Sequence, residues 1–130
     1  MKFKQLSTLL LLAGTSFLSF ATQVNSLSQQ QLLTLLNAPK TEPFVILDVR
    51  SQQEFNQGHI KGALNISHDQ IEQHLTELSQ YKDTLVVVHC RSGRRAQVAE
   101  AVLIEQGFNK LHHLSGDYQA WVAADLPLVK

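Results

Sequence analysis

The chain has 130 residues, of which 44% are apolar and 17% charged, and its 11 basic side chains balance its 11 acidic ones. This length gives room for one compact domain, and the composition is that of a globular protein and not of a disordered segment. The charge balance excludes a broad basic surface for nucleic acid and a polybasic membrane anchor.

The amino-terminal segment has the three parts of a secretory signal peptide. Two lysines lie within the first four residues, residues 9–20 form an apolar run, and Ala21 ends a small-x-small cleavage site. The apolar run is shorter than the roughly 20 residues of a membrane-spanning helix, and polar residues interrupt it. We therefore expect a signal peptide over residues 1–21, and an exported, periplasmic domain over residues 22–130 that is not stably inserted in a membrane after cleavage.

Strand and helix patterns alternate along the rest of the chain. Short apolar runs predict strands at residues 44–47, 64–66, 85–88 and 111–114. Helical spacing and capping residues predict helices that begin at Ser26 or Ser28, at Ser51, near Ile71, near Arg95 and at Gly116. This alternation predicts an α/β domain with a mainly parallel central sheet flanked by helices.

Three polar segments come directly after predicted strands: residues 48–50, 90–95 and 115–116. In parallel sheets, ligands bind outside the carboxyl ends of the strands. We therefore expect the three segments to converge on one edge of the sheet and to form the functional site there.

The segment from Cys90 to Arg95 joins a buried strand to a helix start. Backbone N–H groups in such a loop and in the first helical turn have no intrahelical partners, so they can point at an anion. Arg91, Arg94 and Arg95 add positive charge that favours the ionised thiol, and Gly93 permits a backbone conformation that other residues resist. The alternative, an inert buried cysteine, does not explain this surrounding charge. The segment predicts a cradle for a thiolate or persulfide beside a small anion.

These motifs resemble those of the rhodanese family. The loop Cys90-Arg91-Ser92-Gly93-Arg94-Arg95 is similar to the six-residue active-site loop of that family, and Asp48-Val49-Arg50 is similar to its Asp-x-Arg segment. Residues 54–66 resemble the family's Glu-Phe-x-x-Gly-His-Ile-x-Gly-Ala-x-Asn-Ile stretch. Two positions depart from the family: Ser67 stands where Pro is frequent, and Asp117 stands where a second Gly is usual.

The resemblance implies a single-domain thiosulfate sulfurtransferase. Cys90 would attack the outer sulfur of thiosulfate, release sulfite, and keep a persulfide until a thiol or cyanide removes it. The residues expected to bind the substrate are Arg91, Ser92, Gly93, Arg94, Arg95, Asp48 and Arg50. Two alternatives stay open: a purely structural hydrogen-bonding role for Asp48, and a position on the surface for Arg50. We expect no metal and no other cofactor, since His112 and His113 point in alternate directions on a strand.

Two alternative functions share the same kind of loop. Cysteine phosphatases and arsenate reductases of related fold require Cys-x5-Arg, whereas Ala96 occupies that position here and Arg95 makes Cys-x4-Arg. A sulfur-carrier module that receives sulfur from one protein and delivers it to another would have the same loop as an enzyme. Turnover with thiosulfate separates the carrier from the enzyme.

Overall fold

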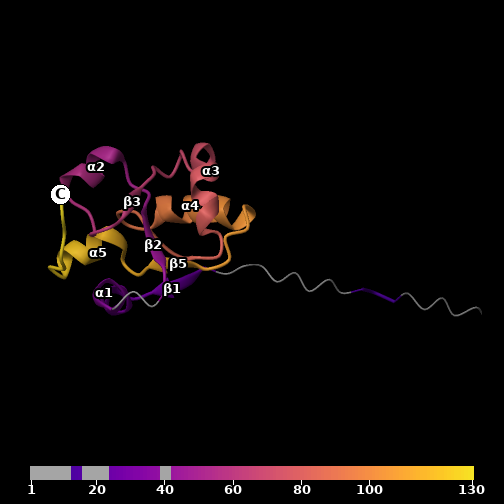
Figure 1. Ribbon diagram of the computed structural model, residues 1–130, viewed down its shortest axis with the longest axis horizontal. Helices are drawn as coiled ribbons and strands as arrows, with labels where there is room; N and C mark the ends of the chain where they lie inside the picture. The colour runs from indigo at the N-terminus through magenta and orange to yellow at the C-terminus, as the bar shows by residue number, and fades with distance from the viewer. Residues whose placement is uncertain (1–12, 16–23, 39–41) are drawn as a thin grey trace, which may run out of the picture.

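The computed structural model describes residues 13–15, 24–38 and 42–130, and its core is one five-stranded sheet with the strand order β1-β5-β4-β2-β3 (Figure 1). The strands are β1 (Asn25–Leu27), β2 (Phe44–Asp48), β3 (Leu64–Asn65), β4 (Leu85–His89) and β5 (Leu111–Leu114). All neighbouring strands run parallel, which confirms the predicted α/β fold with a parallel sheet. The predicted signal peptide lies outside the described residues, except for residues 13–15.

Helices cover both faces of the sheet. They are α1 (Gln29–Asn37), α2 (Gln52–Gln57), α3 (Leu75–Leu78), α4 (Arg94–Glu105) and α5 (Asp117–Ala123). Figure 1 shows α1 and α5 on one side of the sheet, and α3 and α4 on the other. None of the helices in the described ranges is long and apolar enough to cross a membrane.

The apolar core has two layers, one on each face of the sheet, because side chains alternate between the two faces along each strand. Val86 and Val88 of β4 belong to the cluster that also holds Ala99 and Leu103 of α4. Val87, between them, belongs to the opposite cluster, which includes Trp121 of α5. Successive strand residues point to opposite faces, so an uninterrupted apolar run serves a sheet that is buried on both sides.

Capping boxes start α1 and α2. Ser28 and Gln31 satisfy each other's backbone N–H groups at the start of α1. Ser51 and Glu54 do the same for α2, and Gly58 is its C-cap. The sequence predicted the start of α2 from its capping box, which depends only on residues three apart. For α1 it predicted a capping serine, and Ser28 was one of the two candidates.

Two segments differ from the sequence-based expectation. The strand β1 was not predicted, since its three residues have no periodic pattern and gain their structure by pairing with β5. The predicted helix over residues 71–78 is a succession of short turns, namely 3₁₀ turns at Glu72–His74 and Ser79–Tyr81 around the one-turn helix α3. An apolar spacing of three and four residues suits either kind of turn.

The carboxyl-terminal segment folds back on the domain. Val129 and His59 form an antiparallel bridge with two backbone hydrogen bonds of 2.9 Å. The indole N–H of the buried Trp121 donates to the carbonyl of Pro127 at 2.9 Å. The last residues of the chain are therefore part of the packed structure, and Figure 1 shows the C-terminus beside α2.

Candidate active site

Cys90 lies directly after β4, and the residue is 1% exposed. The Gly93 N–H donates a hydrogen bond to the Cys90 sulfur at 3.0 Å. Gly93 has a φ of 115°, in the left-handed region that favours glycine, and this turn directs its amide at the sulfur. The helix α4 begins at the next residue, so the sulfur also lies near the positive end of a helix of 12 residues.

The start of α5 holds the loop backbone in place. The Tyr118 N–H donates to the Cys90 carbonyl, and the Gln119 N–H donates to the Arg91 carbonyl, both at 3.0 Å. Asp117, the first residue of α5, accepts a hydrogen bond from the Cys90 N–H at 3.0 Å. The segments after β4 and β5 therefore meet at one edge of the sheet, as the sequence predicted.

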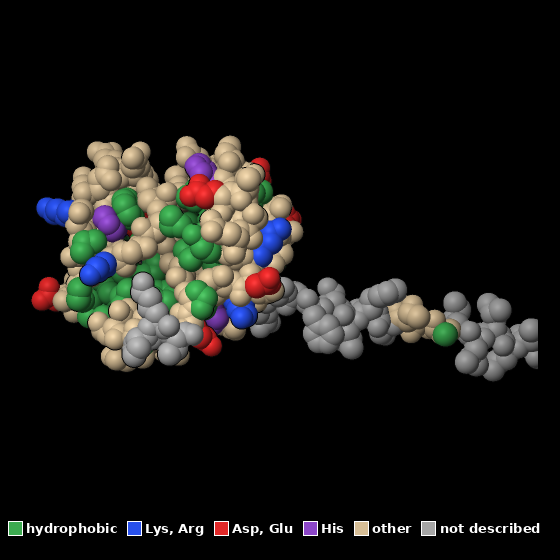
Figure 2. All heavy atoms as spheres, viewed as in Figure 1, with side chains coloured by type: hydrophobic (Ala, Val, Ile, Leu, Met, Phe, Trp, Pro, Cys, Tyr) green, Lys and Arg blue, Asp and Glu red, His purple; other side chains and the backbone are tan. Residues whose placement is uncertain are grey.

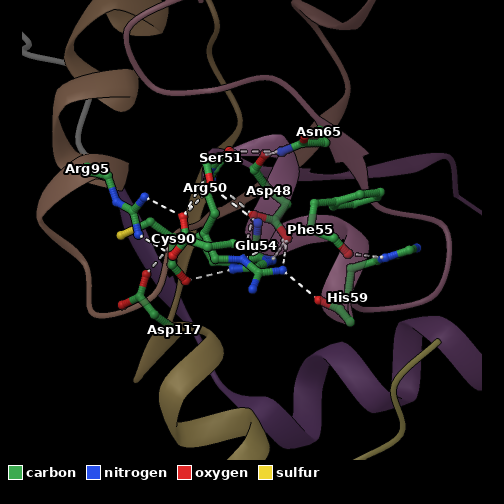
Figure 3. Close-up of polar contacts among 12 residues, drawn as sticks. Asp48, Arg50, Ser51, Glu54, Phe55, His59, Asn65, Cys90, Arg95 and Asp117 are labelled. Atoms are coloured by element: carbon green, nitrogen blue, oxygen red, sulfur yellow. Dashed lines mark hydrogen bonds and ion pairs between the residues drawn. The ribbon is translucent and has the colours of Figure 1, made fainter. Parts of the chain in front are cut away.

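Arg95 connects the loop to α2. Its guanidinium donates two hydrogen bonds to the Glu54 carboxylate, at 2.8 and 3.0 Å, and Figure 3 shows the guanidinium beside the Cys90 sulfur. The bond from Arg95 is the main cause that lowers the pKa of Glu54 to about 2. The same pairing raises the pKa of Arg95. Arg95 therefore keeps a fixed positive charge at the thiol.

The other polar side chains of the loop point to solvent. Arg91, Ser92 and Arg94 are exposed, and neither arginine has an ion-pair partner among the described residues. Such side chains are free to meet an incoming anion at the rim of the site. Their role in substrate binding, like that of Gly93 and Arg95, stays a prediction.

Asp48 and Arg50 form a buried ion pair next to the loop. Their closest nitrogen and oxygen atoms are 2.6 Å apart, and both side chains are almost fully buried. Arg50 also donates to the Gly58 carbonyl at 2.9 Å, and its guanidinium carbon lies 3.7 Å from the centre of the Tyr118 ring. Arg50 is therefore an interior residue. The geometry gives the pair a structural role, and a contact with substrate stays a prediction.

His89 points away from the thiol. Its Nδ1 lies 2.9 Å from the Cys90 carbonyl, so Nδ1 carries the proton and donates it there. Burial lowers the pKa of His89, and its Nε2 has no hydrogen-bond partner. The neutral imidazole is therefore held by the loop backbone and brings no positive charge to the site.

The contacts of His113 with Asp117 and Glu100, near the loop, were not predicted from the sequence. His113 on β5 lies between Asp117 and Glu100 of α4, with its Nε2 2.9 Å from the Asp117 carboxylate and its Nδ1 hydrogen-bonded to Glu100. The sequence indicated only that Asp117 replaces a glycine that is usual in the family. It did not indicate the contact with Glu100, because the approach of α4 to β5 depends on the fold. Within the described ranges, no group of three His, Cys, Asp or Glu side chains is arranged to hold a metal ion.

Two hollows of the surface lie apart from the Cys90 loop. A polar groove of about 540 Å³ runs between α2 and the turn that holds His74, with Ser51 and Asn65 in its lining. Figure 2 shows a notch at this place between the lobes that contain α2 and α3. An apolar hollow of about 740 Å³ lies beside α1 and is lined by Leu33, Leu36 and Phe44 among others. Neither hollow is lined by Cys90 or by another residue of its loop.

Known proteins are similar to this chain over most of its length. A family model described as the rhodanese-like domain matches residues 28–124. A sulfurtransferase of Allochromatium vinosum is 34% identical over 106 residues, which are 82% of this chain and 95% of that protein. The thiosulfate sulfurtransferase GlpE of Shewanella oneidensis is 33% identical over 99 residues, which are 76% of this chain and 93% of that protein.

A solved structure has the same fold. The crystal structure of a rhodanese-related protein from Thermoplasma volcanium superimposes with a TM-score of 0.69 and 26% sequence identity. The superposition covers 81% of this chain and 97% of that one. The likeness therefore extends over most of both chains.

Proposed function

The chain belongs to the rhodanese-like domain family, and from this we propose that it is a sulfurtransferase that takes sulfur from thiosulfate or a similar donor onto Cys90. The observation that carries the proposal is the Gly93 N–H, which donates to the Cys90 sulfur at 3.0 Å with the Arg95 guanidinium nearby. Amide and guanidinium donors stabilise negative charge on sulfur. The same donors suit a thiolate before the reaction and a persulfide after it.

The first half of the reaction loads the cysteine. The Cys90 thiolate attacks the outer sulfur of thiosulfate, a new sulfur–sulfur bond forms, and the sulfur–sulfur bond of thiosulfate breaks. Sulfite leaves with the electron pair of the broken bond, and Cys90 carries a persulfide anion. Exposed Arg91 and Arg94 at the rim favour the approach of the dianion.

The second half returns the cysteine to its starting state. A thiolate or cyanide attacks the outer sulfur of the persulfide, and the bond between the two sulfur atoms of the persulfide breaks. The Cys90 thiolate leaves with the electron pair, and the acceptor becomes a persulfide or thiocyanate. Because Cys90 is 1% exposed, the acceptor atom must enter the loop itself, and this favours small or slender acceptors.

The test follows the sulfur atom. Incubation with thiosulfate should raise the mass of the intact protein by one sulfur atom and should release sulfite, with turnover when cyanide is added. Cys90→Ser should abolish both, while thermal unfolding shows that the variant is folded. Loading without turnover would identify a carrier, and Cys90-dependent hydrolysis of aryl phosphates with little sulfite release would identify a phosphatase instead.

We also propose that the protein is exported and that cleavage follows Ala21. The basic, apolar and small-x-small segments of residues 1–21 support this proposal. N-terminal sequencing of the secreted protein should start at Thr22. A mature protein that still begins at Met1 would contradict it.

A further inference from the structure

Three charged side chains form a continuous chain of hydrogen bonds behind the Cys90 loop. Glu100 of α4 bonds Nδ1 of His113, and Asp117 of α5 lies 2.9 Å from Nε2 of the same ring. Both carboxylates are nearly buried, at 5% and 3% exposure for the whole residues. Charged groups in such a place require partners, and these three residues partner one another.

His113 carries a positive charge in this arrangement. Each ring nitrogen faces a carboxylate oxygen, and a nitrogen without a proton would direct its lone pair at that oxygen. Both nitrogens therefore hold protons. In agreement, the hydrogen bond to Asp117 and then the one to Glu100 raise the pKa of His113 to about 10. The three residues together have two negative charges and one positive charge.

Asp117 lies close to both ends of the turn that holds the sulfur. One carboxylate oxygen accepts from the Cys90 N–H at 3.0 Å. The other faces Gly93, where an added Cβ would lie 3.1 Å from it. Gly93 is the residue whose amide donates to the sulfur, so the carboxylate fits closely beneath the cradle.

The backbone of Asp117 indicates that its side chain has a role. Its φ is 54°, in the left-handed region that costs free energy for any residue except glycine. Asp tolerates this region better than most residues because its short side chain forms local hydrogen bonds. Here the carboxylate bonds the Cys90 N–H and His113, which offsets the strain.

We propose that Asp117 is a positioning residue for Cys90, which fixes the loop backbone and opposes negative charge on the sulfur, and that His113, held by Glu100, partly offsets this charge. The combined charge of His113 and Asp117 then determines how strongly the Cys90 loop stabilises a thiolate or persulfide anion. The other charged groups around the loop are Arg91, Arg94, Arg95 with Glu54, and the pair Asp48–Arg50. The consequence for sulfur transfer rests on the function proposed above, whereas the effect on the thiol does not.

The test is the pH profile of Cys90 alkylation by iodoacetamide, a neutral probe that reacts with the thiolate. Asp117→Asn keeps an oxygen for the Cys90 N–H and removes a negative charge next to the loop, so its profile should move to lower pH by about 0.5–1 unit. His113→Gln leaves two carboxylates without their cation, so its profile should move to higher pH by a similar amount. If Asp117 and His113 only supported the backbone, their substitutions would not move the alkylation profile in opposite directions.

Asp125→Asn is the matched control. Asp125 has the same φ of 54° but is exposed at the end of α5, and its substitution should leave the profile in place. Asp117→Gly suits the left-handed backbone and serves as the second charge-removing variant if Asp117→Asn does not fold. Profiles that stay in place, or that move in the same direction in the Asp117 and His113 variants, overturn the proposal. Because alkylation needs no thiosulfate, failure of the sulfurtransferase assay does not affect this result.

Discussion

Arg95 has two partners, and its side chain is the most constrained of the three loop arginines. It donates two hydrogen bonds to Glu54, and its guanidinium lies beside the Cys90 sulfur (Figure 3). Glu54 is itself held by the N–H and the hydroxyl of Ser51. A cation fixed in this way loses little conformational freedom when a charged substrate arrives.

Arg95→Ala should therefore lower kcat/KM for thiosulfate by about ten- to a hundred-fold, since a charge-assisted hydrogen bond contributes about 1.5–3 kcal/mol. Arg94→Ala removes an exposed cation and should have a smaller effect. Steady-state assays of sulfite release on both variants give the comparison. An Arg95 variant as active as the unaltered protein would contradict this role.

His113 gives the folded protein a specific pH dependence. Its pKa is about 10 when folded, against 6.5 for an ordinary histidine, so the folded state binds the proton more tightly. The resulting stabilisation is fully present below about pH 6.5 and is lost as the pH rises toward 10. We expect the difference in Tm between the unaltered protein and His113→Gln to shrink across this range. A difference that is constant from pH 6 to pH 10 would contradict the pairing.

The element that connects the fold to the site is α2. It has only six residues, and its capping box supplies the carboxylate that binds Arg95. A helix start is therefore also part of the scaffold around the sulfur. The capping box at the start of α1 has Gln31 in place of a glutamate and supplies no carboxylate to the Cys90 loop.

Ser51→Ala should cost about 1 kcal/mol of stability, because it removes the side-chain cap of α2. It should also lower kcat/KM by a few-fold, since Glu54 loses one of its supports and holds Arg95 less firmly. Ser28→Ala is the control, with a similar loss of stability and unchanged turnover. Chemical denaturation and sulfite assays measure the two effects, and equal activity losses in both variants would contradict the link through Glu54.

Local patterns predicted those parts of the fold that depend on neighbouring residues. The apolar runs of β2, β4 and β5 and the capping box of Ser51 were read correctly because each pattern needs only a few adjacent positions. The strand β1 was missed because it exists only through its pairing with β5. The hydrogen bonds of His113 were missed for the same reason, since Glu100 lies 13 residues away on another element.

At the scale of the whole molecule, the parallel sheet explains why the site is where it is. The segments after β2, β4 and β5 emerge at the same edge, and the first turn of α5 holds the loop after β4. The sequence predicted this convergence from the order of strands and helices. It did not predict how the segments interlock, because burial of the Asp48–Arg50 pair depends on packing against Tyr118 and Gly58.

The returning carboxyl-terminal segment has a practical consequence for handling the protein. Val129 pairs with His59, next to the Gly58 carbonyl that accepts a hydrogen bond from Arg50. A purification tag fused behind Lys130 would therefore start one residue from this bridge and beside α2, whereas trimming the last few residues by a carboxypeptidase would remove the bridge itself.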